Sequence, residues 1–139
     1  MTIRTAIIGL GIMGRRMAEH MALHPEFSVN AMWDLDPVAR KLAKDAVPDT
    51  AIVGSVKAAL AEVDLVYLAC PPVPRKAYAL MAANAGKAIF LEKPLGVDVS
   101  ESRALVDTIA ASGVPAAVNF TQAAGAALTN VSTAAQAGE

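Results

Sequence analysis

The chain has 139 residues, of which 55% are hydrophobic and 18% are charged, and its formal net charge is −1. This length suffices for one domain with a packed core, the composition excludes a disordered chain, and no window approaches the roughly 20 apolar residues of a membrane span. Scattered basic residues give no indication of a nucleic-acid partner, and the single cysteine, Cys70, without any metal-ligand cluster, predicts a reducing, cytoplasmic location.

Short apolar runs alternate with longer helical patterns along the chain. In chain order we predict strand 2–9, helix 13–23, strand 27–33, a helix that begins with Asp36 as N-cap and Pro37, strand 50–54, helix 55–61, strand 64–70, helix 74–85, strand 87–92, a helix from Asp98 or Ser100 to 112, strand 115–120 and helix 121–139. Six strands joined by helical crossovers predict a doubly wound α/β fold, a parallel six-stranded sheet with helices on both faces.

A glycine motif lies between the first predicted strand and the first predicted helix. Gly9, Gly11 and Gly14 have the G-x-G-x-x-G spacing in the strand–loop–helix context that binds a dinucleotide. The first glycine permits a tight turn, the second lets a pyrophosphate approach the backbone, and the third lets helix and strand pack closely. Free N–H groups at the helix start, which includes Ile12 and Met13, would bind the anion. The alternative is a packed glycine turn without a ligand.

An acidic residue follows the second strand. Asp34 comes 20 residues after Gly14, where a carboxylate accepts hydrogen bonds from the ribose hydroxyls and repels the extra phosphate of NADP. Leu35 offers no donor to such a phosphate. NAD is therefore favoured as the cofactor, and the nearby Arg40 and Lys41 keep NADP open as the alternative.

Two segments resemble two different dehydrogenase families. The opening G-L-G-I-M-G-R-R-M-A resembles the β-hydroxyacid dehydrogenases. However, Glu92-Lys93-Pro94 after the fifth strand resembles the E-K-P hallmark of the Gfo/Idh/MocA oxidoreductases, and the A-C-P-P-V-P-R segment is similar to that family's A-T-P-P-x-x-H. Cys70 stands there where threonine is usual, and Arg75 stands where histidine is usual. This second resemblance covers nearly the whole chain, so we favour the Gfo/Idh/MocA family.

The resemblance implies roles for residues at the carboxyl ends of the fourth and fifth strands. Lys93 would lie near the nicotinamide and the substrate and help move the hydroxyl proton, and Lys93–Pro94 would be a cis peptide. Other cofactor contacts would come from Cys70, Pro71, Pro72 and Glu92. A surface Glu92/Lys93 pair is the alternative, and Arg75 is left open between a phosphate or ribose contact and a solvent-exposed position.

Members of this family continue into a second domain that supplies the substrate pocket. We therefore expect residues 1–120 to form the dinucleotide-binding Rossmann domain and residues 121–139 a connecting helix. The parent would be an NAD(P)-dependent oxidoreductase of a sugar, a polyol or a related hydroxy compound, and this chain alone would bind the cofactor without full activity. Its uncovered apolar surface favours self-association into a homo-oligomer. The alternative is a regulatory dinucleotide-binding module without turnover.

Overall fold

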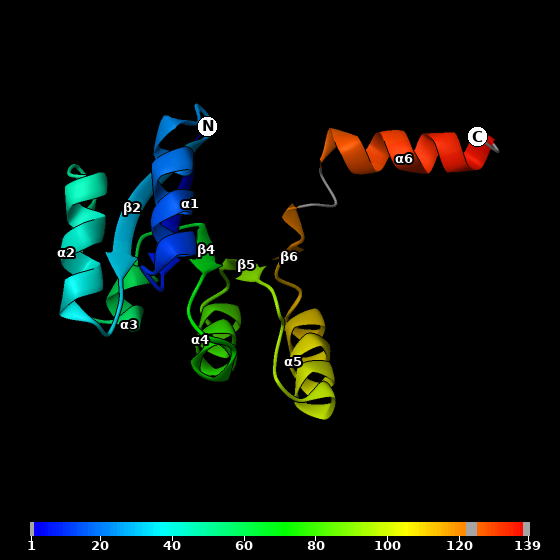
Figure 1. Cartoon of the computed structure of the whole chain (residues 1–139). Helices are drawn as coiled ribbons and strands as arrows, with labels where there is room; N and C mark the ends of the chain where they lie inside the picture. The colour runs from blue at the N-terminus through cyan, green and yellow to red at the C-terminus, as the bar shows by residue number, and fades with distance from the viewer. Residues whose placement is uncertain (1, 122–124, 138–139) are drawn as a thin grey trace.

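A six-stranded parallel sheet forms the centre of the molecule (Figure 1). The computed structural model describes residues 2–121 and 125–137. The strands are β1 (Ile3–Ile8), β2 (Phe27–Trp33), β3 (Ala51–Ile52), β4 (Leu65–Leu68), β5 (Ala88–Glu92) and β6 (Ala116–Asn119). Their spatial order is β3-β2-β1-β4-β5-β6. Strands are therefore added on one side of β1 up to β3 and on its other side from β4 onward. Open α/β sheets bind ligands at the carboxyl ends of the strands at such a switch point.

Helices cover both faces of the sheet, which confirms the predicted doubly wound α/β fold. They are α1 (Ile12–Leu23), α2 (Pro37–Ala46), α3 (Val56–Ala59), α4 (Pro72–Asn84), α5 (Val99–Ser112) and α6 (Ala126–Ala137). Side chains alternate along β1, so Ile7 packs with α1 and α2 on one face, whereas Ala6 and Ile8 pack with α3, α4 and α5 on the other. Figure 1 shows α6 beyond β6, apart from these two helical layers.

Side-chain caps fix where two helices begin. The Asp36 carboxylate accepts a hydrogen bond from the Val38 N–H at 2.8 Å, which confirms the predicted cap of α2. Asp98, rather than Ser100, caps α5 by accepting from the Glu101 N–H at 2.8 Å. The caps therefore fix the start of α2 four residues after the end of β2, and the start of α5 seven residues after the end of β5.

Several predicted elements are shorter in the structure, among them the third strand and the last helix. The third strand was predicted over 50–54, but β3 has only two residues and pairs only with β2. The last helix was predicted over 121–139, and α6 occupies 126–137; residues 122–124 and 138–139 lie outside the described residues. None of the helices in the described part of the chain has the length and apolar character needed to cross a membrane.

Candidate cofactor-binding site

The glycine loop connects β1 to α1 and has little space beside two of its three glycines. Gly9 has φ +91°, and a Cβ there would lie 2.3 Å from the backbone N of Cys70. A Cβ on Gly14 would lie 1.8 Å from the carbonyl oxygen of Gly9. The predicted tight turn and close helix–strand packing are thus both present. Gly11 differs, because no atom lies within 4 Å of the Cβ position.

The start of α1 presents free backbone donors at this loop. The first bond within the helix runs from the Arg15 N–H to the Gly11 carbonyl at 3.0 Å. Among the described residues no side chain caps this helix, so the N–H groups of Ile12, Met13 and Gly14 point out of its end. Together with the helix dipole and the open space at Gly11, these donors can receive an anionic group against the backbone.

Asp34 joins the end of β2 to the glycine loop. Its Oδ2 accepts a hydrogen bond from the Leu10 N–H at 2.6 Å, and its Oδ1 accepts from the Asp36 N–H at 2.9 Å. A carboxylate oxygen has two lone pairs, so both oxygens can still accept from further donors. The backbone therefore orients the half-buried carboxylate, which retains lone pairs for further donors.

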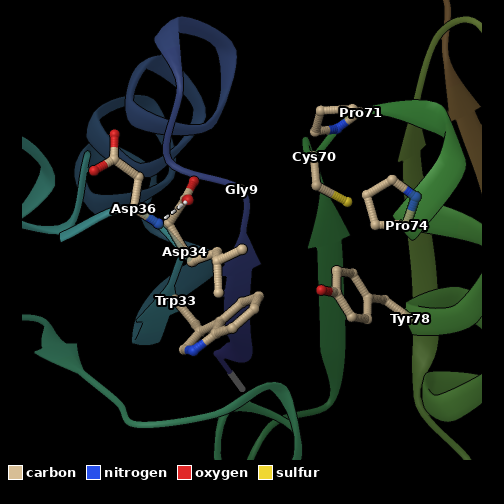
Figure 2. A pocket seen from close by; sticks show the side chains of 9 residues that line it. Gly9, Trp33, Asp34, Asp36, Cys70, Pro71, Pro74 and Tyr78 are labelled. Atoms are coloured by element: carbon tan, nitrogen blue, oxygen red, sulfur yellow. Dashed lines mark hydrogen bonds between the residues drawn. The ribbon is translucent and has the colours of Figure 1, made fainter. Parts of the chain in front are cut away.

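A pocket of about 440 Å³ opens beside Asp34, between the carboxyl ends of β1 and β2 and the start of α4. Figure 2 shows Trp33, Asp34 and Asp36 on one side, and Cys70, Pro71, Pro74 and Tyr78 on the other. The rings of Trp33 and Tyr78 meet edge to face, with centroids 5.7 Å apart. Apolar and aromatic walls with two carboxylates held by backbone N–H groups suit a nucleoside.

The pocket brings together five of the residues predicted for the site, Gly9, Asp34, Leu35, Cys70 and Pro71. Four other residues line it that were not predicted for the site: Trp33, Asp36, which was predicted only as a helix cap, Pro74 and Tyr78. Two local features of the sequence indicate the aromatic ones. Trp33 adjoins Asp34, and Tyr78 lies one helical turn after Pro74. Pro72 lies elsewhere, in a smaller hollow that Leu95 and Gly96 also line.

Cys70 follows β4 and adjoins Gly9. Only 6% of the residue is exposed, and burial raises the pKa of its thiol, although the Arg75 guanidinium opposes this effect. A buried protonated thiol is a poor nucleophile. Its place in the wall of the pocket is therefore that of a small packing group.

The end of β5 carries a buried carboxylate and an exposed lysine. Glu92 is 5% exposed, and its Oε1 accepts hydrogen bonds from the Tyr67 hydroxyl and from Asn119 Nδ2, the latter at 2.6 Å. Burial and the bond to this carboxylate raise the pKa of Tyr67. The Lys93 N–H donates to Glu92 Oε2 at 3.2 Å, and Lys93–Pro94 is the predicted cis peptide. The alternative of a surface Glu92/Lys93 pair is wrong for Glu92, because its carboxylate lies inside the protein.

Arg75 corrects a second expectation. It is not solvent-exposed, since only 3% of the residue is exposed, and it does not line the pocket. Its guanidinium donates to the backbone carbonyls of Cys70, Glu92 and Pro94. The residue therefore connects the start of α4 with the ends of β4 and β5.

Within residues 2–121 and 125–137, no group of three His, Cys, Asp or Glu side chains gathers as a metal ion would require. Asp34 and Glu92, the two acidic residues predicted for the site, lie apart. Asp34 is bonded to the glycine loop and Glu92 to Tyr67 and Asn119, on opposite sides of the switch point between β1 and β4.

The strand order and the glycine loop at the switch point define the class of the protein, a dinucleotide-binding Rossmann domain. Residues 3–120 match the model of an oxidoreductase family with an NAD-binding Rossmann fold. The chain belongs to this family, Gfo/Idh/MocA, and the resemblance of its first segment to the β-hydroxyacid dehydrogenases is confined to the glycine loop and the helix that follows.

Named relatives agree with this assignment. The chain is 33% identical over 120 residues to an inositol 2-dehydrogenase of Acidiphilium cryptum, covering 81% of this chain and 35% of the relative. It is 37% identical over 108 residues to a UDP-N-acetylglucosamine 3-dehydrogenase of Acidithiobacillus ferrooxidans, covering 75% and 32%. It thus spans about a third of the length of the curated relatives it matches.

The fold also matches a solved structure. Scyllo-inositol dehydrogenase from Lactobacillus casei, crystallised with NAD(H) and scyllo-inositol, superposes with a TM-score of 0.90. The superposition covers 99% of this chain and 42% of that one, at 22% identity. At this identity the match supports the fold, including the sheet order on which the site depends.

Proposed function

We propose that this chain binds NAD across the carboxyl ends of β1 and β4, as the cofactor-binding part of an oxidoreductase that acts on a sugar, a polyol or a related hydroxy compound. One observation carries the proposal: the Asp34 carboxylate is bonded to the glycine loop and lines a pocket of nucleoside size. Residues 1–120 would be the dinucleotide-binding domain, and residues 121–139 a connecting helix. The position of α6 outside the two helical layers supports this division.

The three parts of the dinucleotide have three sets of partners. The pyrophosphate would lie against Gly11 and the free N–H groups of Ile12 and Met13. The adenosine would occupy the pocket, with its ribose hydroxyls donating to Asp34. The nicotinamide would then extend along the strand ends toward β5 and Lys93, as the resemblance to the family implies.

NAD is the proposed cofactor rather than NADP. A phosphate on the adenosine ribose would meet the Asp34 carboxylate, which the Leu10 and Asp36 N–H groups hold in place. Leu35, 80% exposed beside it, offers no donor that could compensate. Repulsion between the two anions therefore disfavours NADP.

Lys93 is the proposed acid/base residue. When bound, the nicotinamide supplies the acceptor or donor of a hydride. In its neutral form the Lys93 amine, exposed at the carboxyl end of β5, would hydrogen-bond the substrate hydroxyl and accept its proton while the hydride leaves the carbinol carbon for the cofactor. The inositol and UDP-sugar dehydrogenases among the relatives support a polyhydroxylated substrate.

Calorimetric titration of the purified chain with NAD and with NADP tests the proposal. Trp33 is the only tryptophan and lines the pocket, so its fluorescence provides a second, local signal. We expect binding of NAD, weaker binding of NADP, and no appreciable turnover of a sugar or polyol. Absence of NAD binding would contradict the cofactor assignment. Steady reduction of NAD with a polyol would contradict the expectation that this chain is inactive alone.

A further inference from the structure

Arg75 is the one buried cation of the described core, and it does not line the pocket of the proposed cofactor site. It lies in the first turn of α4, and the side chain of a charged residue there usually faces solvent. Instead, its side chain runs beneath the helix to the ends of two strands. A buried guanidinium is costly unless its donors are satisfied, so the groups it bonds to indicate its role.

The two edges of the guanidinium bond to two different segments. Nε and Nη2 both donate to the Cys70 carbonyl, Nε at 3.0 Å and Nη2 at 2.5 Å. Nη1 donates to the carbonyls of Glu92 and Pro94. The planar fork therefore joins the end of β4 to the turn that follows β5, a geometry that a single ammonium nitrogen does not reproduce.

The carbonyls that Nη1 binds flank Lys93 on both sides. The N–H of Lys93 is held as well, because it donates to the buried Glu92 carboxylate. Tyr67 and Asn119 in turn fix that carboxylate. The backbone at Lys93 is thus restrained at three points, while its side chain remains exposed.

We propose that Arg75 is a positioning residue, whose guanidinium holds the Lys93 turn against the end of β4 and so aims Lys93 at the nicotinamide end of the cofactor site. This rests on the function proposed above only for the identity of what Lys93 faces; the fixing of the turn does not depend on it. The arginine carries out this task at a position where the family usually has histidine.

Amide hydrogen exchange, read by NMR residue by residue, tests the fixing of the turn. In the Arg75→Met chain the Lys93 amide should exchange at least about tenfold faster, the effect of losing a buried hydrogen-bonded group locally. Core amides such as Val66 should exchange as in the unaltered chain. Arg75→Lys should behave like Arg75→Met, because charge alone cannot join both segments. Arg103→Met, which removes an exposed arginine of α5, is the matched control and should change neither amide.

Three results would overturn the proposal in this arm. The first is unchanged exchange at Lys93, and the second is full recovery in Arg75→Lys. The third is an equal acceleration of Lys93 and the core amides, which would make Arg75 a stabiliser of the whole fold. Should Arg75→Met not fold, the unaltered chain still decides: a clamped guanidinium gives separate NMR signals for its Nη1 and Nη2 groups, and averaged signals would contradict the clamp.

Ligand titration separates this proposal from the proposed function. For Arg75→Met we expect NAD to bind about five- to tenfold more weakly and ADP, which lacks the nicotinamide half, to change by less than about twofold. Equal losses for both ligands would show that Arg75 acts on the adenosine pocket through Cys70, and would overturn the role assigned at Lys93. If the unaltered chain binds no NAD, the proposed function fails, and the exchange experiment still decides whether Arg75 fixes the turn.

Discussion

Gly14→Ala tests whether the glycine loop is fixed by packing. The new methyl carbon would lie 1.8 Å from the carbonyl oxygen of Gly9, against the 3.0 Å below which real Cβ contacts essentially do not occur. The atom in the way belongs to the backbone, so α1 and the end of β1 must move apart by about 1 Å. Overpacking of a core typically costs about 1–3 kcal/mol, and a backbone clash belongs at the upper end. We expect the free energy of unfolding to fall by about 3 kcal/mol.

Gly11→Ala is the matched control in the same loop. Its added methyl meets nothing within 4 Å, and Gly11 has a φ of −63°, which alanine adopts freely. We expect its free energy of unfolding to stay within about 0.5 kcal/mol of the unaltered chain. The methyl would nevertheless enter the space assigned to the pyrophosphate, so NAD affinity should fall at least about tenfold.

Urea unfolding followed by circular dichroism measures the first effect, and calorimetric titration with NAD measures the second. The two variants are expected to separate stability from binding, Gly14→Ala losing the first and Gly11→Ala losing only the second. Equal urea midpoints for Gly14→Ala and the unaltered chain would refute the packing argument. Unchanged NAD affinity in a stable Gly11→Ala chain would refute the placement of the pyrophosphate.

Three further predictions follow from single side chains. Asp34→Asn replaces one accepting oxygen with a donor next to backbone N–H groups, so the NAD affinity measured by calorimetry should fall about tenfold and the preference over NADP should shrink; an unchanged preference would contradict the role of the charge. The Cys70 thiol should react with a disulfide reagent far more slowly in the folded chain than in urea, because burial restricts access and raises its pKa, and saturating NAD should slow it further. The hydrogen bonds from Arg4 lower the pKa of Asp64 from 3.8 to about 2, so their contribution to stability is fully present above about pH 4 and lost as the pH falls toward 2; the gap in urea midpoint between the unaltered chain and Arg4→Met should close over that interval.

The glycine loop and Asp34 could be predicted from the sequence because their constraints are local. A strand, three glycines at fixed spacing and an acid after the next strand specify a backbone path whatever the rest of the chain does. Gly9 and Gly14 have the close contacts that the spacing predicts. Caps behave in the same way, since Asp36 bonds to an N–H only two residues away.

The length of the third strand and the burial of Arg75 could not be predicted from the sequence, because both depend on residues far away along the chain. Only two residues of the predicted strand 50–54 pair with β2, and among the described residues no strand lies on the other side of β3 to extend it. Arg75 looks like an exposed first-turn residue in its own helix. Its partners Glu92 and Pro94 lie 17 and 19 residues further along the chain, and no periodicity within α4 can indicate them.

The backbone is held in place differently in the two halves of the site. At the glycine loop, the backbone segments approach closely because the glycines have no side chains, so a single added methyl group is enough to displace them. At the β5 end, position is set by polar side chains that reach across strands: Arg75 from α4, and Tyr67 and Asn119 from β4 and β6 through Glu92. Loss of a donor there leaves a buried carbonyl or carboxylate short of a partner, which costs more than the bond itself contributes. Substitutions in this network should therefore loosen Lys93 before they disturb the adenosine pocket, and the two halves of the cofactor site are separable by mutation.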